Sequence, residues 1–113
     1  MKPNFSDFNS LTALHFQPMK GQAYADLGGE LAIMDSNSGI YYGLDPVGAR
    51  IWSLLMDWKT VGEIRDTLLE EYDVSLSELE CDVANLLHEL SSKGLIEVAP
   101  PGAKRPNHVT EFH

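Results

Sequence analysis

The sequence predicts an α+β domain in which a three-stranded antiparallel sheet precedes three helices, an order also found in the winged helix-turn-helix. Two observations carry this prediction. Residues 22–44 alternate apolar and polar side chains around two groups of turn-forming residues, as hairpin strands do. Residues 46–93 instead repeat apolar side chains every three or four positions, which is the period of a helix with one buried face.

The strands are expected at residues 23–27, 30–34 and 40–44. In the second of them Leu31 and Ile33 share one face, as a half-buried strand requires. The turn at residues 35–39 ends in Gly39, which can adopt the positive φ of a tight reversal. Because residues 40–44 are rich in β-branched and aromatic side chains, we expect them to complete a hairpin.

The first two helices are predicted by capping residues. Asp45 is placed to accept hydrogen bonds from free amides, and Pro46 suits the first helical position. Thr60 is followed three residues later by Glu63, which is the pattern of a capping box. Each start is followed by apolar residues at helical spacing.

The third helix is expected to begin after Ser75 or Ser77. It carries apolar side chains at three- and four-residue spacing, and Lys93 and Gly94 suit a basic last turn and a glycine stop. Residues 95–98 are expected to form a short closing strand.

Both ends of the chain lack apolar periodicity and contain prolines. The sequence therefore predicts a flexible N-terminal extension over residues 1–20, a folded domain over residues 21–98 and a flexible tail over residues 99–113. Within the extension, Leu11, Leu14 and Phe16 are the side chains that could pack on the domain.

The composition excludes several classes of protein. The chain has 113 residues with 17 acidic and 8 basic side chains, a net charge of −9, and such a charge opposes binding to nucleic acid or to anionic membranes. One cysteine leaves no internal disulfide, and neither a secretory signal nor a membrane span is recognisable. We therefore expect a cytoplasmic protein of a single domain.

No constellation of residues predicts catalysis, a cofactor or a metal site. Cys81 and His88 lie seven residues apart, near two helical turns, but a metal site needs three or four convergent ligands. No base is apparent near Cys81, and Gly28 and Gly29 lack the lysine and helix start of a phosphate loop. The sequence thus predicts a binding module and not an enzyme.

A winged-helix DNA-binding regulator is the alternative interpretation of the same element order. The predicted third helix, however, exposes mainly acidic side chains where a recognition helix presents basic or amide groups. Asn85 alone suits contact with a base. An adaptor that recognises only a folded partner is a further possibility.

Several stretches together resemble PqqD-like proteins, the peptide-recognition domains of ribosomal peptide modification pathways. The first is Tyr41-Tyr42-Gly43-Leu44-Asp45-Pro46, followed by Gly48-Ala49-Arg50-Ile51-Trp52. The resemblance continues through residues 60–64, 71–74, 81–87 and 94–96, and spans about residues 22–98. The first stretch looks most like the small stand-alone recognition proteins of lasso-peptide biosynthesis.

The resemblance implies a protein that binds the leader peptide of a ribosomal precursor without catalysis. The leader would add as an extended strand to the third strand, residues 40–44, which would form an edge of the sheet beside the third helix. The complex would then deliver the precursor to a processing cysteine protease, with a cyclase acting afterwards. We expect a monomer or a weak dimer, since an exposed edge permits self-pairing.

A strand at a sheet edge can pair with any extended peptide through its main chain, so selectivity must come from side chains. We expect an apolar groove with an acidic rim, which would accept an aromatic or aliphatic leader residue next to a basic or hydroxyl-bearing one. The predicted peptide-binding residues lie on the third strand and the third helix: Ile40, Tyr41, Tyr42, Gly43, Leu44, Glu78, Asp82, Asn85, Leu86 and Glu89.

Overall fold

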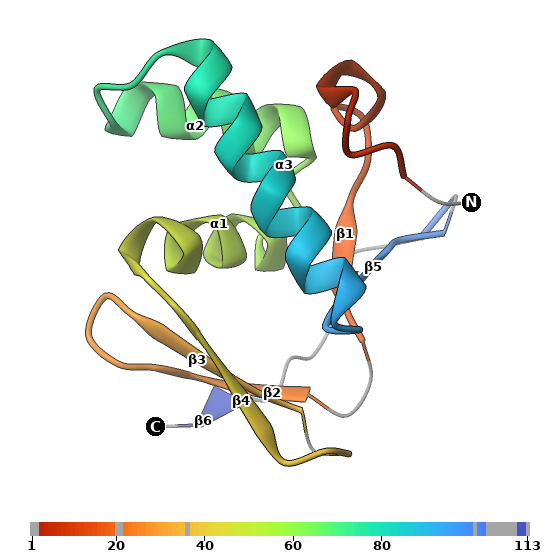
Figure 1. Cartoon of the computed structure of the whole chain (residues 1–113), viewed down its shortest axis with the longest axis vertical. Coiled ribbons are helices and arrows are strands. Elements are labelled where there is room, and N and C mark those ends of the chain that lie inside the picture. Colours follow the sequence, from red (N-terminus) through yellow and green to blue (C-terminus); the bar gives the residue numbers. More distant parts are fainter. Residues whose placement is uncertain (1–2, 20–21, 36, 101, 104–110, 113) are drawn as a thin grey trace.

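The computed structural model describes residues 3–19, 22–35, 37–100, 102–103 and 111–112. It confirms the predicted α+β order of three antiparallel strands followed by three helices (Figure 1). The strands are β2 (Gln22–Asp26), β3 (Leu31–Asp35) and β4 (Ile40–Leu44), and the helices are α1 (Pro46–Met56), α2 (Val61–Glu71) and α3 (Leu76–Ser92). Shorter elements are η1 (Phe8–Ser10), β1 (Phe16–Pro18), β5 (Ile96–Val98) and β6 (Glu111–Phe112).

The order of the main sheet is β4-β3-β2-β6, which leaves β4 at one edge as predicted. The β3–β4 hairpin pairs Leu31 with Leu44 and Ile33 with Tyr42. Its turn depends on Gly39, whose φ of 71° lies in the left-handed region that glycine adopts without strain. The register places Leu31, Ile33 and Leu44 on the face that the helices cover, and all three are buried.

The helices begin at the predicted caps. Asp45 Oδ1 accepts a hydrogen bond of 2.8 Å from Gly48 N, and Pro46 is the first residue of α1. The capping box of α2 is complete, because Thr60 and Glu63 each accept a hydrogen bond from the main-chain amide of the other. Ser75, and not Ser77, caps α3.

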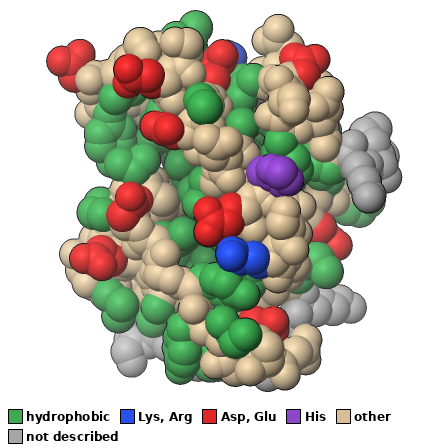
Figure 2. Space-filling view, in the orientation of Figure 1, with side chains coloured by type: hydrophobic (Ala, Val, Ile, Leu, Met, Phe, Trp, Pro, Cys, Tyr) green, Lys and Arg blue, Asp and Glu red, His purple; other side chains and the backbone are tan. Residues whose placement is uncertain are grey.

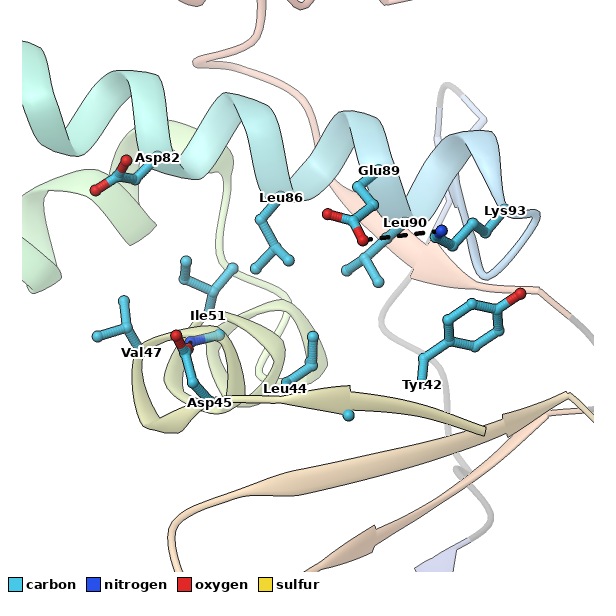
Figure 3. Close-up of a pocket in the computed structure, with 12 residues that line it drawn as sticks. Tyr42, Leu44, Asp45, Val47, Ile51, Asp82, Leu86, Glu89, Leu90 and Lys93 are labelled. Carbon is cyan, nitrogen blue, oxygen red and sulfur yellow. Dashed lines mark hydrogen bonds and ion pairs between the residues drawn. The ribbon is translucent and has the colours of Figure 1, made fainter. Parts of the chain in front are cut away.

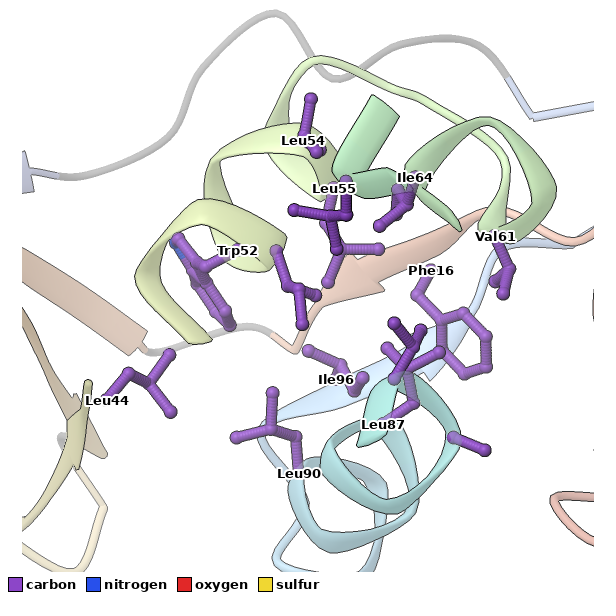
Figure 4. Packing of buried hydrophobic residues seen from close by; sticks show 14 of the residues in the cluster. Phe16, Leu44, Trp52, Leu54, Leu55, Val61, Ile64, Leu87, Leu90 and Ile96 are labelled. Atoms are coloured by element: carbon purple, nitrogen blue, oxygen red, sulfur yellow. The ribbon is translucent and has the colours of Figure 1, made fainter. Parts of the chain in front are cut away.

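The core lies where α1, α3 and β5 meet, on the face of the main sheet that the helices cover (Figure 4). Trp52 and Leu55 from α1 pack in one buried cluster with Leu87 from α3 and Ile96 from β5. Leu55 and Leu87 come from the apolar helix faces that the three- and four-residue spacing predicts. Because α1 contributes to the centre of this cluster, its position relative to the edge strand β4 is fixed by packing.

The N-terminal segment is packed on the domain, so the predicted flexible extension is wrong for its described residues. Leu11 and Phe16 are 0% and 1% exposed. β1 pairs antiparallel with β5, with Phe16 opposite Val98. Two main-chain carbonyls of the segment accept hydrogen bonds from the first amides of α2, which lack partners within the helix: Val61 N donates to Leu14 O and Gly62 N to Thr12 O, both at 3.0 Å.

The close approach of this segment also explains a glycine in the first turn of α2. A Cβ added at Gly62 would lie 3.1 Å from Thr12 O. The predicted closing strand is confirmed as β5, although it pairs with β1 and not with the main sheet.

The predicted flexible C-terminal tail falls mostly outside the described residues. Residues 101, 104–110 and 113 are not described. The pair Glu111–Phe112 forms β6, parallel to β2 at the edge of the sheet opposite to β4. Among the described residues, no helix combines the length and the apolar character needed to span a membrane.

Candidate functional site

A groove of about 470 Å³ runs between the edge strand β4, the start of α1 and the C-terminal half of α3 (Figure 3). We call it the β4–α3 groove. It is lined by residues from these three elements and their ends: Tyr42, Gly43, Leu44, Asp45, Val47, Gly48, Ile51, Asp82, Leu86, Glu89, Leu90 and Lys93.

The bottom of the groove is apolar. Leu44, Ile51 and Leu90 are buried there, and the half-buried Val47 and Leu86 stand above them. Local sequence explains how they meet. Leu44 ends β4, and α1 begins directly after the capping residue Asp45. The side chains at positions 47 and 51, one helical turn apart, therefore lie on the face of α1 next to the strand. An aliphatic or aromatic side chain placed here would remove these groups from water.

The rim of the groove carries more acidic than basic side chains. Asp82 and Glu89 come from α3 and Asp45 from the start of α1, whereas Lys93 is the one basic residue of the lining. Lys93 Nζ lies 3.9 Å from Glu89 Oε1, and the charged side chains visible on this face of the molecule are mainly acidic (Figure 2). The rim therefore favours a positively charged side chain beside the apolar part of the groove.

The edge strand itself is accessible. Ile40 and Tyr41 are 51% and 67% exposed, and among the described residues β4 pairs only with β3. Main-chain amides and carbonyls on its outer side are thus positioned to pair with an extended chain, and such pairing does not depend on the partner's side chains.

The structure brings most of the predicted peptide-binding residues together. Tyr42, Gly43, Leu44, Asp82, Leu86 and Glu89 all line the groove. Ile40 and Tyr41 lie on the same edge strand, nearer the hairpin turn. Glu78 lies in the first turn of α3 and is not part of the lining.

Asn85 lies away from the groove. It lines a separate cavity next to the N-terminal segment together with Phe5 and His88, and its Nδ2 lies 3.5 Å from Cys81 Sγ. The ring of His88 stacks on Phe5 with the ring centroids 4.8 Å apart. Successive residues of an α-helix are rotated by about 100° about its axis, so the side chain of Asn85 points in a different direction from that of Leu86.

Sequence reasoning missed the contribution of α1. Val47, Gly48 and Ile51 line the groove, as do Leu90 and Lys93 at the end of α3. A signal was present, since positions 47, 48 and 51 fall on one helical face immediately after the edge strand. Ile51 belongs to the buried core and Val47 packs against it, and a core side chain can also form the bottom of a groove.

An ion pair on the far side of α1 fixes this helix against α2. Arg50 Nη2 lies 2.7 Å from Glu71 Oε2, and Arg50 Nε donates to both carboxylate oxygens. The side-chain hydrogen bonds between these groups raise the pKa of Arg50 and lower the pKa of Glu71. The pair lies outside the groove and thus has an architectural role.

The described residues contain no group of three or more histidine, cysteine, aspartate or glutamate side chains that could hold a metal ion. Cys81 is an exposed free cysteine. What the groove offers is an apolar trough, an acidic rim and an open strand edge, and these features suit the binding of an extended peptide.

Comparisons with known proteins agree with this chemistry. The sequence profile of the family described as Coenzyme PQQ synthesis protein D (PqqD) matches residues 30–96. A structure of TbiB1 in complex with the TbiA(beta) leader peptide is similar, with a TM-score of 0.69 and 34% identity over 78% of this chain and 98% of that chain.

A second structure is lasso peptide synthetase B1 complexed with the leader peptide. Its TM-score is also 0.69, with 25% identity over 74% of this chain and 98% of that chain. No curated protein sequence matches the chain.

Proposed function

The chain belongs to the PqqD family, and from this premise we propose that it binds the leader peptide of a ribosomally made precursor, most specifically that of a lasso peptide. Two similar structures are complexes with leader peptides. The single observation on this chain that supports the proposal is the open edge of β4 beside the β4–α3 groove.

In the proposed mechanism, the leader extends the main sheet as a strand next to β4. Each main-chain hydrogen bond contributes about 0.5–1.5 kcal/mol, so several of them give moderate affinity with little selectivity. Selectivity then comes from side chains. An apolar leader residue fills the trough between Leu44 and Leu86, and a basic neighbour lies near Asp82 or Glu89 on the rim.

The chain itself performs no catalysis in this proposal. It holds the leader and presents the precursor to a separate processing enzyme, a cysteine protease, with a cyclase acting later. It does so in the cytoplasm, where precursor peptides are translated, as a monomer or a weak dimer. The acidic exposed side of α3 opposes the winged-helix alternative, because it would meet the phosphates of a DNA duplex with like charge.

Titration of the chain with a synthetic leader lacking the core peptide tests the proposal. We expect heat of binding and NMR shift changes in residues 40–44 and at Asp82, Leu86 and Glu89. A scrambled leader of the same composition is the matched control. Absence of heat and of shift changes with the true leader would contradict leader binding.

A further inference from the structure

The two long edges of the main sheet differ. Among the described residues, the outer side of β4 has no neighbouring strand, whereas β2 has β6 next to it (Figure 1). β6 pairs parallel with β2, with Tyr24 opposite Glu111 and Ala25 opposite Phe112. The PqqD profile ends at residue 96, so β6 lies outside the part of the chain that matches the family.

The β2–β3 turn determines which main-chain groups of β2 point outward. Leu27 N donates to Glu30 O at 2.8 Å, so these two residues form a hydrogen-bonded pair of the antiparallel ladder. Such pairs alternate with pairs whose main-chain groups point away from each other, and Asp26 opposite Leu31 is of this second kind. The main-chain amides and carbonyls of Asp26 and Tyr24 therefore point to the outer side of β2.

The parallel register brings β6 to these outward groups. In a parallel pair, a residue whose main-chain groups face the neighbouring strand bonds to the residues before and after the one opposite. Since Tyr24 lies opposite Glu111, its carbonyl faces the amide of Phe112. The carbonyl of Phe112 in turn faces the amide of Asp26, whereas the amide of Glu111 points away from β2.

β2 lacks the features within a strand that usually protect an edge. Lysine, proline, a bulge or a covering segment commonly keep an edge strand from pairing with another chain. β2 contains no lysine and no proline, and Asp26 at its end is its one charged residue. Its register with β3 continues over five consecutive pairs without a bulge. A covering segment is therefore the device left to protect it, and β6 lies in the position to do so.

We propose that Glu111 and Phe112 close the β2 edge against a second copy of this chain. With β4 as the one open edge of the main sheet, two copies can pair edge to edge, and the assembly then stops at a dimer. With both edges open, each copy pairs on two sides and the assembly does not close. The inference goes beyond the proposed function, because it concerns assembly of the chain whether or not a leader is bound.

Two proline variants of the full chain test the proposal. Phe112→Pro removes the amide that faces Tyr24, whereas Glu111→Pro removes an amide that points away from β2 and is the matched control. Amide hydrogen exchange at Asp26 reports pairing with β6. Exchange at Ala25, whose amide faces β3, reports whether the β2–β3 hairpin is intact. Sedimentation equilibrium without a leader measures assembly.

We expect the Asp26 amide to exchange slowly in the wild type and at least about fivefold faster in Phe112→Pro, as the loss of two neutral hydrogen bonds predicts. Ala25 should exchange at the same rate in all three proteins. At high protein concentration, Phe112→Pro should form species larger than a dimer, whereas the wild type and Glu111→Pro should remain monomers or dimers.

A semisynthetic chain with N-methylphenylalanine at position 112 is a second variant. It removes the same donor but keeps the side chain, so it replaces Phe112→Pro if faster exchange at Ala25 shows that proline disturbs the hairpin. It should reproduce both the faster exchange at Asp26 and the larger species.

Three results would overturn the proposal. The first is fast exchange of the Asp26 amide in the wild type, which would show an open β2 edge. The second is equal behaviour of the variants at positions 111 and 112. The third is faster exchange at Asp26 without species larger than a dimer. Failure of a leader to bind would contradict the proposed function alone, since none of these measurements uses a leader.

Discussion

Lys93 at the C-terminal end of α3 lies over the ring of Tyr42 on the edge strand, with Nζ 5.4 Å from the ring centroid. The same Nζ lies 3.9 Å from Glu89 Oε1, so one cation links the helix, the strand and the acidic rim (Figure 3). This contact closes one end of the β4–α3 groove and leaves the end near Asp82 as its more negative part. Attraction between a cation and an aromatic face is typically about 0.5–1 kcal/mol at exposed positions.

Tyr41→Pro should weaken leader binding about tenfold or more, and more severely than Tyr41→Ala. Proline removes a main-chain donor and fixes φ, whereas alanine removes only an exposed side chain. Calorimetry with the leader measures the effect, and thermal unfolding shows whether the fold survives, as expected at an edge position. Equal losses in the two variants would contradict strand addition.

Leu86→Ala should weaken leader binding about tenfold, because it removes the apolar wall opposite Leu44. Leu69→Ala is the matched control, since Leu69 is also half-buried against the core but lies on α2 and not in the groove. The two variants should lose similar stability, whereas only Leu86→Ala should lose affinity. A similar loss of affinity in both would show that the effect comes from destabilisation.

Asp82→Asn should weaken binding about two- to fivefold at low salt if the leader places a basic residue on the rim, as proposed. The difference from wild type should shrink as salt increases, since exposed charges are screened. Asp73→Asn removes a carboxylate from an exposed position outside the groove and should change nothing. An effect of Asp82→Asn that is independent of salt would argue for a packing role.

Glu63→Ala should lower the melting temperature at pH 7, but much less at pH 3. The Thr60 amide donates to Glu63 Oε1 at 2.8 Å and lowers the pKa of this carboxyl below its ordinary value of 4.5. A carboxyl with a lowered folded-state pKa contributes stability above its unfolded pKa, and that contribution is lost as the pH falls through the folded pKa. Thermal unfolding of both proteins from pH 7 to pH 3 measures this, and a constant difference in melting temperature would contradict it.

Phe16→Ala should destabilise the domain by about 3–5 kcal/mol, the usual effect of removing a fully buried aromatic side chain. Urea unfolding measures it. Ala13→Gly, at an exposed position of the same segment, is the control and should have a small effect. A negligible effect of Phe16→Ala would restore the sequence-based prediction of a flexible extension.

The three helix starts and the β3–β4 hairpin were predictable, because each depends on residues close together in the chain. The edge position of β4 was instead implied by the resemblance to PqqD-like proteins. Asp45, Thr60 and Gly39 perform local tasks that their side chains or backbone freedom define. The helical period also placed Asp82, Leu86 and Glu89 on one flank of α3, although Glu78 of the same predicted stripe lies outside the groove.

Other features depended on contacts between distant segments. The packing of the N-terminal segment requires β5, about 80 residues later, to pair with β1. Nothing in residues 1–20 indicates this partner, because a three-residue strand has too little pattern of its own. The contribution of Val47 and Ile51 to the groove likewise depends on where α1 packs relative to α3.

The sequence by itself determined the elements and their order. The tertiary structure decided which side chains share a cavity: it joined α1 to the groove and turned Asn85 away from it. The physical reason is that hydrogen-bonded caps and turns are set by neighbours in the chain, whereas a cavity is set by the packing of surfaces that only the folded chain brings together.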